Sequence, residues 1–352
     1  MELNIKALQE LFKNTNTSYK YLFFYALIKI INNDNSKKNI SFNEIIREML
    51  IIAWLPSFQF NLNFRKQDQI KYLLKSLNKN TEETIKRNKP TNKIIRKIYL
   101  SIDNSLKKNQ TANILENRLL RYVMVRLLRP FYRRLKKMPE SGKISMHNLS
   151  NKILIKDYKK EQPPYQIDEN NREIILNKKW TRYIKEHYLF LELWVLDEWY
   201  KYMQYQNRNS PSLYEKLKFP KFQRNSLDKQ RKFWKKIIKQ HEIKCIFTNE
   251  ILNEDNFDID HFICWNFLAH DQEWNLIPVL SEINRSKNNK IPDRKFIDLF
   301  TDFKIKSFNY ARTILSPKKY NEYLAEHSNF INFSNNQCFT PSFKSKYNEE
   351  IN

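Results

Sequence analysis

Apolar residues recur at three- and four-residue spacing through the first half of the chain, which is typical of amphipathic helices. The clearest case lies in residues 17–32, where Thr17 or Ser18 is expected to cap the helix. Five apolar residues fall on one face of this segment, namely Tyr21, Phe24, Leu27, Ile28 and Ile31. The N-terminal half is therefore predicted to be helical.

Capping and breaking residues bound further helices. Ser41 and Glu44 form a capping box ahead of an apolar run, and Pro56 is expected to close that helix. Another helix is expected to end before Pro130. The segments that complete this helical pattern are residues 111–129, 179–205 and 227–240.

Polar stretches indicate where the parts of the chain meet. The only glycine, Gly142, lies in the turn-like segment PESGK, and residues 157–173 are polar and contain Pro163 and Pro164, as in a linker. A second break is expected at residues 207–212. We expect four parts: a helical N-terminal domain over 1–160, a helical connector over 161–240, a distinct module over 241–310 and a polar extension over 311–352.

The hydrophobic pattern changes after residue 240. The segments IKCIF (243–247) and FDIDHF (257–262) predict two strands joined by a polar turn. A long loop and a helix with Ser281 as its cap are expected to follow. The expected fold class is therefore mostly α, with a small α+β module in the C-terminal third.

The chain is strongly basic, with 63 Lys and Arg against 38 Asp and Glu in 352 residues and a formal net charge of +25. This charge favours nucleic acid or another anionic surface as partner, although an AT-rich genome also produces chains rich in Lys, Asn and Ile. Six arginines occur between positions 118 and 134, and Arg118, Arg121 and Arg129 lie close to one helical face. They form either a surface that follows phosphates or a solvated basic face.

Cysteine usage and hydropathy bear on the compartment. Cys245, Cys264 and Cys338 lie far apart and no CxxC pair occurs, which argues against a disulfide framework and against a structural zinc site. The N-terminus lacks the pattern of a signal peptide, and the apolar run at residues 21–31 is too short to cross a bilayer. We therefore expect a cytoplasmic protein without membrane contact.

The segment after residue 240 also carries the residue types that phosphodiester hydrolysis needs. That reaction requires an activated water and neutralisation of charge on the phosphorus. Asp260 and Asn284 offer hard oxygen ligands for one Mg²⁺ or Mn²⁺ ion, and His261 can accept a proton from water near neutral pH. Asn275 is expected to hold the imidazole through its side-chain carbonyl.

Neighbouring residues extend this candidate site. Arg285 or Lys287, near a helix start that favours anions, is expected to bind the flanking phosphate. Asp258 shares a strand face with Asp260 and is either a supporting carboxylate or a solvated residue. Because adjacent strand residues point to opposite faces, the strand must end or distort at Asp260 and His261 if both face one phosphate.

The order and spacing of these residues resemble the HNH nuclease family, also called the ββα-metal fold. Its pattern is a D-H pair, an Asn about 14 residues on, and an Asn or His about nine residues beyond that, followed by Lys. Here the pair is Asp260-His261 and the later positions are Asn275, Asn284 and Lys287, a spacing that is also similar to the HNH domain of RNA-guided CRISPR nucleases. The resemblance implies one-metal hydrolysis that leaves a 5′-phosphate and a 3′-hydroxyl. It makes Asp260 and Asn284 the metal ligands, His261 the base, and Asn275 the residue that orients this base.

The match covers about 50 of the 352 residues and departs from the family pattern in two places. Cys245 stands alone, with Thr248 where a zinc-binding partner would be, and Cys264 replaces a common proline. The hairpin is therefore expected to be held by apolar packing rather than by zinc, through Ile246, Phe247, Phe257 and Ile259. His270 and Asp271 are mainly expected to be ordinary loop residues.

The leading hypothesis is a metal-dependent DNA endonuclease of bacterial restriction or anti-phage defence, whose N-terminal domain recognises DNA, a partner protein or a second copy. NTNTSYKYLFFYALIKII and RLLRYVMVRLLRPFYRRL resemble a domain that precedes HNH modules in such proteins. One alternative is a nucleic-acid-binding or regulatory subunit of a larger complex, which the intact set of site residues disfavours. Another is a mobile-element nuclease or an RNA-guided nuclease component.

Overall fold

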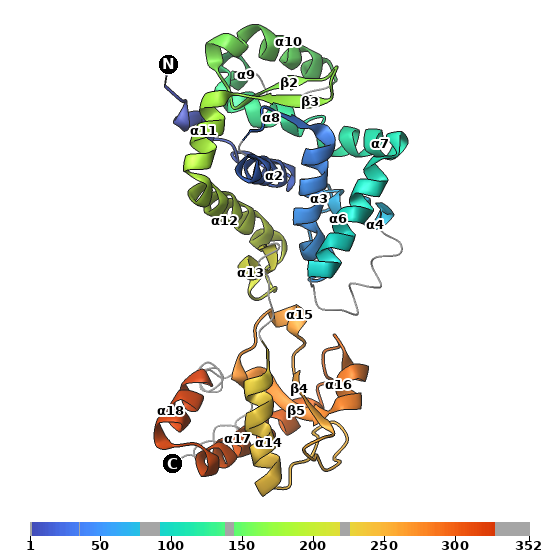
Figure 1. Cartoon of the computed structure of the whole chain (residues 1–352), viewed down its shortest axis with the longest axis vertical. Coiled ribbons are helices and arrows are strands. Elements are labelled where there is room, and N and C mark those ends of the chain that lie inside the picture. Colours follow the sequence, from blue (N-terminus) through green and yellow to red (C-terminus); the bar gives the residue numbers. More distant parts are fainter. Residues whose placement is uncertain (1, 35, 78–91, 138–143, 219–225, 328–352) are drawn as a thin grey trace. The chain divides into compact units, whose positions relative to one another are not determined.

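The computed structural model describes residues 2–34, 36–77, 92–137, 144–218 and 226–327. The chain forms two compact units, Met1–Phe222 and Gln223–Asn352 (Figure 1). Residues 161–222 of the expected connector belong to the first unit, and the basic helix that follows belongs to the second. The finer division into four parts stays a prediction.

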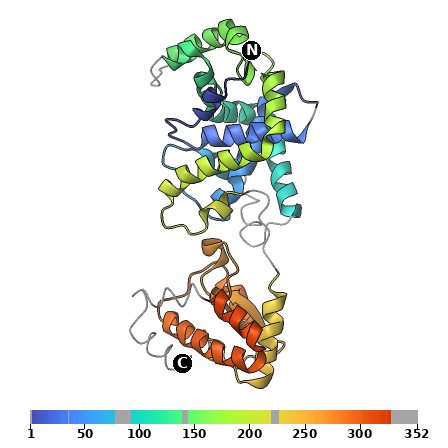
Figure 2. The same ribbon diagram turned by 90° about the vertical axis from the view of Figure 1, so that its left-hand side faces the viewer.

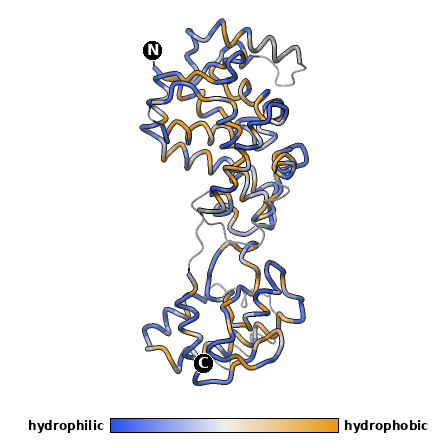
Figure 3. Tube along the Cα trace, turned by 45° about the vertical axis from the view of Figure 1, so that its right-hand side comes forward, coloured by the Kyte–Doolittle hydropathy of each residue, from blue (hydrophilic) through white to orange (hydrophobic). Residues whose placement is uncertain are grey.

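Two apolar helices form the centre of the first unit. α2 (Tyr19–Asn33) and α3 (Phe42–Phe58) pack against each other, and most of their side chains are buried. The capping box predicted before α3 is present, because Ser41 Oγ accepts from the Glu44 amide while Glu44 Oε2 accepts from the Ser41 amide. Pro56 lies inside α3 instead of closing it, and the helix runs on to Phe58. α12 (Tyr188–Gln206) packs on α2 through one buried face, and Figure 3 shows the hydrophobic positions along the chain.

Further helices pack around this pair. The single helix expected over 111–129 is wrong: α7 (Asn109–Leu119) and α8 (Val123–Leu128) are separated by a turn. Leu119, Leu120 and Val123 are all buried at this turn. The helix expected over 179–205 is likewise divided, since α11 (Lys178–Glu186) precedes α12. The remaining helices of this unit are α1 (Ile5–Gln9), α4 (Ile70–Leu77), α6 (Asn92–Leu106), η1 (Arg129–Phe131), α9 (Arg133–Lys136), α10 (Ile144–Glu161) and α13 (Leu213–Leu217).

A small sheet replaces the linker expected over 157–173. β2 (Tyr165–Asp168) and β3 (Glu173–Leu176) form an antiparallel hairpin, and β1 (Asn39–Ser41) pairs with the other edge of β3. Tyr165 and Ile174 are fully buried. The linker prediction is therefore wrong, because the hairpin gains its partner from a strand more than 120 residues earlier in the chain.

The second unit is an α+β module, which confirms the expected fold class of a mostly α chain with a small α+β module in its C-terminal third. Its two-stranded sheet consists of β4 (Phe257–His261) and β5 (Leu276–Leu280). The strand predicted over 243–247 is wrong: only an isolated bridge joins Lys244 to Ile251. The helices of this unit are α14 (Asp228–Gln240), α15 (Trp265–Leu268), η2 (Glu273–Asn275), α16 (Ser281–Lys287), α17 (Phe296–Ile314) and α18 (Pro317–Glu326).

Apolar side chains from both strands and from the flanking helices form the core of this unit. Phe257 is fully buried, and Ile246, Phe247 and Ile259 pack against the same core, as the sequence predicts. Figure 2 shows α17 and α18 of this unit in red, packed against each other. None of the helices in the described ranges is both long and apolar enough to span a bilayer.

Candidate active site

The candidate catalytic pair lies at the end of β4. Asp260 pairs with Ile277 and His261 with Leu276, and β4 ends at His261. Both side chains are buried, so the alternation of inward and outward positions breaks at this pair. The expected strand end is therefore present, and it lets adjacent residues share one site.

The imidazole of His261 is held by a loop carboxylate. His261 Nε2 lies 2.8 Å from Asp271 Oδ1, in the loop between α15 and η2. A carboxylate only accepts hydrogen bonds, so this contact places the proton on Nε2 and leaves Nδ1 as the basic nitrogen. Among the described residues nothing else bonds the ring. Asp271 was expected to be an ordinary loop residue, and its short distance along the chain from His261 was the only sequence signal.

Asn275 makes a different contact from the expected one. Its Oδ1 accepts from the Ile263 amide at 2.8 Å, and its Nδ2 donates to the Ile263 carbonyl at 2.9 Å. The residue is fully buried, and its own carbonyl accepts from the Phe262 amide at 2.8 Å. Asn275 therefore fixes the backbone that follows His261, whereas Asp271 makes the contact to the ring that was expected of Asn275.

Lys287 turns inward from α16. Its Nζ lies 2.8 Å from Asp260 Oδ2 and donates to the His261 carbonyl at 2.6 Å. The side chains of Lys287 and Asp260 are 7% and 9% exposed. The ammonium of Lys287 neutralises this carboxylate and holds the end of β4, and the phosphate contact expected of Lys287 stays a prediction.

The other residues predicted around the pair are Asp258, Ser281, Asn284 and Arg285. Asp258 accepts from Arg231 Nη1 of α14 at 2.8 Å, so its structural partner is this arginine. Ser281 is the first helical residue of α16 and makes no capping bond, which corrects its expected role as cap. Asn284 follows in the first turn, half-buried and without a side-chain hydrogen bond to the described residues, and Arg285 is exposed.

The residues present fit a hard divalent cation. Asp260 Oδ2 is buried and, apart from the ion pair with Lys287, makes no hydrogen bond to the described residues. Carboxylate and amide oxygens are the ligands that Mg²⁺ takes, and this ion keeps several waters, so two protein ligands suffice. In the described part of the chain no group of three or more His, Cys, Asp or Glu residues is arranged to hold a metal. Asp260 and Asn284 are thus the candidate ligands.

A buried lysine supports the loop that carries Asn275. Lys304 of α17 donates from Nζ to the carbonyls of Glu273 and Leu276, at 2.7 and 2.6 Å. Burial lowers the pKa of Lys304 to about 7, and burial raises the pKa of Glu273. No sequence pattern distinguishes Lys304 from the many other lysines, because its role depends on its burial beside η2.

The cysteines and the N-terminal arginines are not among the residues of the candidate active site. Cys245 and Cys264 are buried free thiols, and Cys338 lies outside the described residues. Arg118 and Arg129 line one cavity of the first unit, whereas Arg121 does not line it. The basic face predicted on one straight helix is therefore split between α7, a turn and η1.

The comparisons with known proteins agree with this arrangement. A family model described as HNH endonuclease matches residues 244–293, the range from the turn before β4 to the residues after α16. Searches of curated proteins and of solved structures found no match. Residues 244–293 of this chain therefore form an HNH endonuclease domain.

Proposed function

We propose that this protein is a Mg²⁺- or Mn²⁺-dependent endonuclease that hydrolyses phosphodiester bonds of DNA. The observation that carries this proposal is the buried Asp260–His261 pair at the end of β4, with Asp271 bonded to Nε2 of the imidazole. The match to HNH endonucleases over the same residues supports the general reaction type.

His261 is the general base in this proposal. Its Nδ1 accepts a proton from the attacking water, and the carboxylate of Asp271 stabilises the imidazolium that forms. Asn275 keeps the backbone after His261 in place through its two bonds to Ile263. Asp260 and Asn284 would hold the divalent cation, which neutralises charge that develops on the phosphate. The expected products carry a 5′-phosphate and a 3′-hydroxyl.

Exposed cations of the second unit are proposed to contact the DNA backbone. Arg285 follows Asn284 on α16 and is exposed. On α14, Lys229, Lys232 and Lys236 are exposed at three- and four-residue spacing and form no ion pair with the described residues. The net charge of +25 supports a polyanionic substrate.

A role in bacterial restriction or anti-phage defence is proposed from the resemblance of the N-terminal segments described above. The candidate DNA contacts of the first unit are Arg118, Arg121 and Arg129. This unit is also a candidate for binding a partner protein or a second copy of the chain. The buried free thiols of Cys245 and Cys264 favour a reducing, cytoplasmic setting. A purely regulatory subunit would not need the Asp260, His261 and Asp271 arrangement.

The test is cleavage of plasmid DNA in Mg²⁺ or Mn²⁺ by the purified chain and by His261→Ala. Loss of a general base typically lowers the rate by about 10² to 10⁴. His261→Ala should therefore lose cleavage but still bind DNA, and EDTA should stop the unaltered protein. His270→Ala, nine residues further along, is the matched control and should cleave normally. Cleavage by His261→Ala at the normal rate would refute the proposed base.

A further inference from the structure

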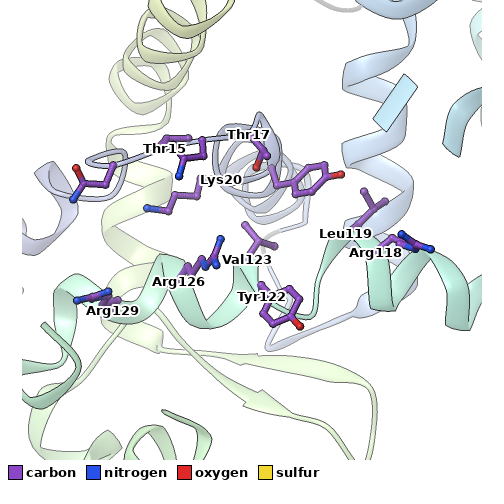
Figure 4. A pocket seen from close by; sticks show the side chains of 12 residues that line it. Thr15, Thr17, Lys20, Arg118, Leu119, Tyr122, Val123, Arg126 and Arg129 are labelled. Carbon is purple, nitrogen blue, oxygen red and sulfur yellow. The ribbon is translucent and has the colours of Figure 1, made fainter. Parts of the chain in front are cut away.

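The first unit contains a cavity of about 380 Å³ between the segment that leads into α2 and the α7–α8 region (Figure 4). Small-molecule sites are commonly about 300–1,000 Å³. The cavity is therefore large enough for a ligand of nucleotide size. The active-site residues described above belong to the other unit.

The lining of this cavity is basic. Lys20, Arg118, Arg126 and Arg129 contribute to it, and none of its twelve lining residues, all within the described ranges, is Asp or Glu. Figure 4 shows Arg118 and Arg129 at opposite ends, with Arg126 between them and extending toward the segment that carries Thr17. Positive charge is thus spread along the length of the cavity.

The contacts of Arg118 and Arg126 are to neutral groups. Arg118 Nη1 donates to the neutral side chain of Gln69 at 2.9 Å, and Arg126 lies over the Tyr122 ring at 5.7 Å. Neither forms an ion pair with a described residue. The carboxylate of the buried Asp68 is not among the lining groups and accepts from the Ser18 and Ile70 amides, at 2.7 and 3.0 Å. Asp68 therefore anchors the segment before α2 without closing the cavity to anions.

The other lining residues suit the sugar and base of a nucleotide. Tyr19 and Tyr122 offer aromatic rings, on which bases stack, and Asn14 and Asn16 offer amides that pair with base edges. Thr15 adds a hydroxyl oxygen that can accept, since its proton is donated to the Phe12 carbonyl at 2.7 Å. Guanidinium groups bind phosphates through paired hydrogen bonds.

We propose that this cavity binds a nucleotide ligand with two or more phosphates, which occupy the row formed by Arg118, Arg126 and Arg129. The ligand is either a free nucleoside triphosphate or a short single strand, since both present phosphates in series next to a base. The lining residues belong to the first unit and the hydrolytic residues to the second, and the proposed binding does not depend on the proposed nuclease activity.

The experiment titrates the full chain, in EDTA and at low salt, with the four deoxynucleoside triphosphates and with 5′-phosphorylated tetrathymidylate. Arg126→Gln should weaken the affinity for the probe that binds by about tenfold or more, as expected for loss of a charge-assisted bond to phosphate. Arg96→Gln is the matched control, because Arg96 is exposed on α6 and does not line the cavity. It should change the affinity by less than about twofold, and higher salt should weaken binding in both proteins.

Tighter binding of a triphosphate identifies a free nucleotide as the ligand, and tighter binding of the tetranucleotide identifies a strand. If Arg126→Gln fails to fold, Arg118→Gln tests the row of arginines at one end of the cavity, against the same control. No saturable binding of either probe would overturn the proposal. Equal weakening by Arg126→Gln and Arg96→Gln would also overturn it, since it would show a general basic surface.

Discussion

Lys287 and Asp260 form the most buried ion pair of the candidate site, with 2.8 Å between Nζ and Oδ2. In a poorly hydrated site an unpaired carboxylate is costly, and removal of one partner of a buried pair typically destabilises a protein by about 3–5 kcal/mol. A divalent cation held by Asp260 would supply the same compensating charge. Lys287 and the metal are therefore expected to act on one carboxylate.

Lys287→Met should lower the melting temperature in EDTA, and Mg²⁺ should restore much of the loss. The stabilisation by Mg²⁺ should be larger in this variant than in the unaltered protein, because the cation then replaces a missing charge. Thermal unfolding with and without Mg²⁺ measures the difference. Lys290→Met, an exposed position on the same segment, serves as the control. An equal effect of Mg²⁺ on Lys287→Met and on the unaltered protein would mean that the cation does not bind at Asp260.

At the scale of elements, α14 presents two kinds of lysine. Lys235 and Lys239 form ion pairs with Glu254, at 3.4 and 3.1 Å, whereas Lys229, Lys232 and Lys236 are exposed and have no ion pair with the described residues. Only the second set, which shares one face of the helix, is free to neutralise phosphates.

Replacement of Lys229, Lys232 and Lys236 by Gln should flatten the salt dependence of DNA binding. Each lost phosphate contact lowers the slope of log K against log salt by roughly 0.9 on duplex DNA. The measurement uses the His261→Ala protein, so that substrate is not cut during titration. Replacing Lys235 and Lys239 by Gln is the control and should change the slope much less. Equal slopes in all three proteins would show that α14 does not follow the DNA backbone.

At the scale of the whole molecule, the two units contain buried groups with opposite responses to acid. Burial raises the pKa of Asp68 in the first unit to about 6, above the ordinary value of 3.8. Burial lowers the pKa of His327 in the second unit to about 3, below the ordinary value of 6.5. The folded state therefore binds more protons than the unfolded state at Asp68, and fewer at His327.

From these signs, His327 contributes stability that is complete above pH 6.5 and is lost as the pH falls toward about 3. Asp68 has the reverse effect: its contribution is complete below pH 3.8 and is lost as the pH rises through about 6. The second unit should thus weaken relative to the first between pH 6 and 4, by an amount on the order of a few kcal/mol. Hydrogen exchange followed separately in the two units measures this change.

His327→Gln should reduce the acid sensitivity of the second unit and leave that of the first unit unchanged. His327 is fully buried, and its Nδ1 lies 2.8 Å from the Tyr323 carbonyl, a bond that the neutral ring can donate. Asp68→Asn should change only the first unit. If the pH dependence of the second unit were the same in His327→Gln, protonation of this imidazole would not be its cause.

The sequence by itself determined the features that local spacing encodes. Heptad-like apolar spacing was sufficient for the inner helix α2, and Ser41 with Glu44 was sufficient for the start of α3. Asp260-His261 and the later asparagines lie within one short stretch, so the HNH resemblance was visible without any tertiary contact. In each case residues close in sequence act together.

Only the tertiary structure decided the contacts between segments. β5 has an apolar sequence that pattern alone could not distinguish from a buried loop, and its pairing with β4 makes it a strand. The same holds for the inward orientation of Lys287, for the bond that His261 donates to Asp271, and for the two bonds of Asn275 to Ile263. Because burial removes water as a hydrogen-bond partner, a buried charge or amide needs a partner within the protein. Which residue becomes that partner depends on how distant segments of the chain pack together.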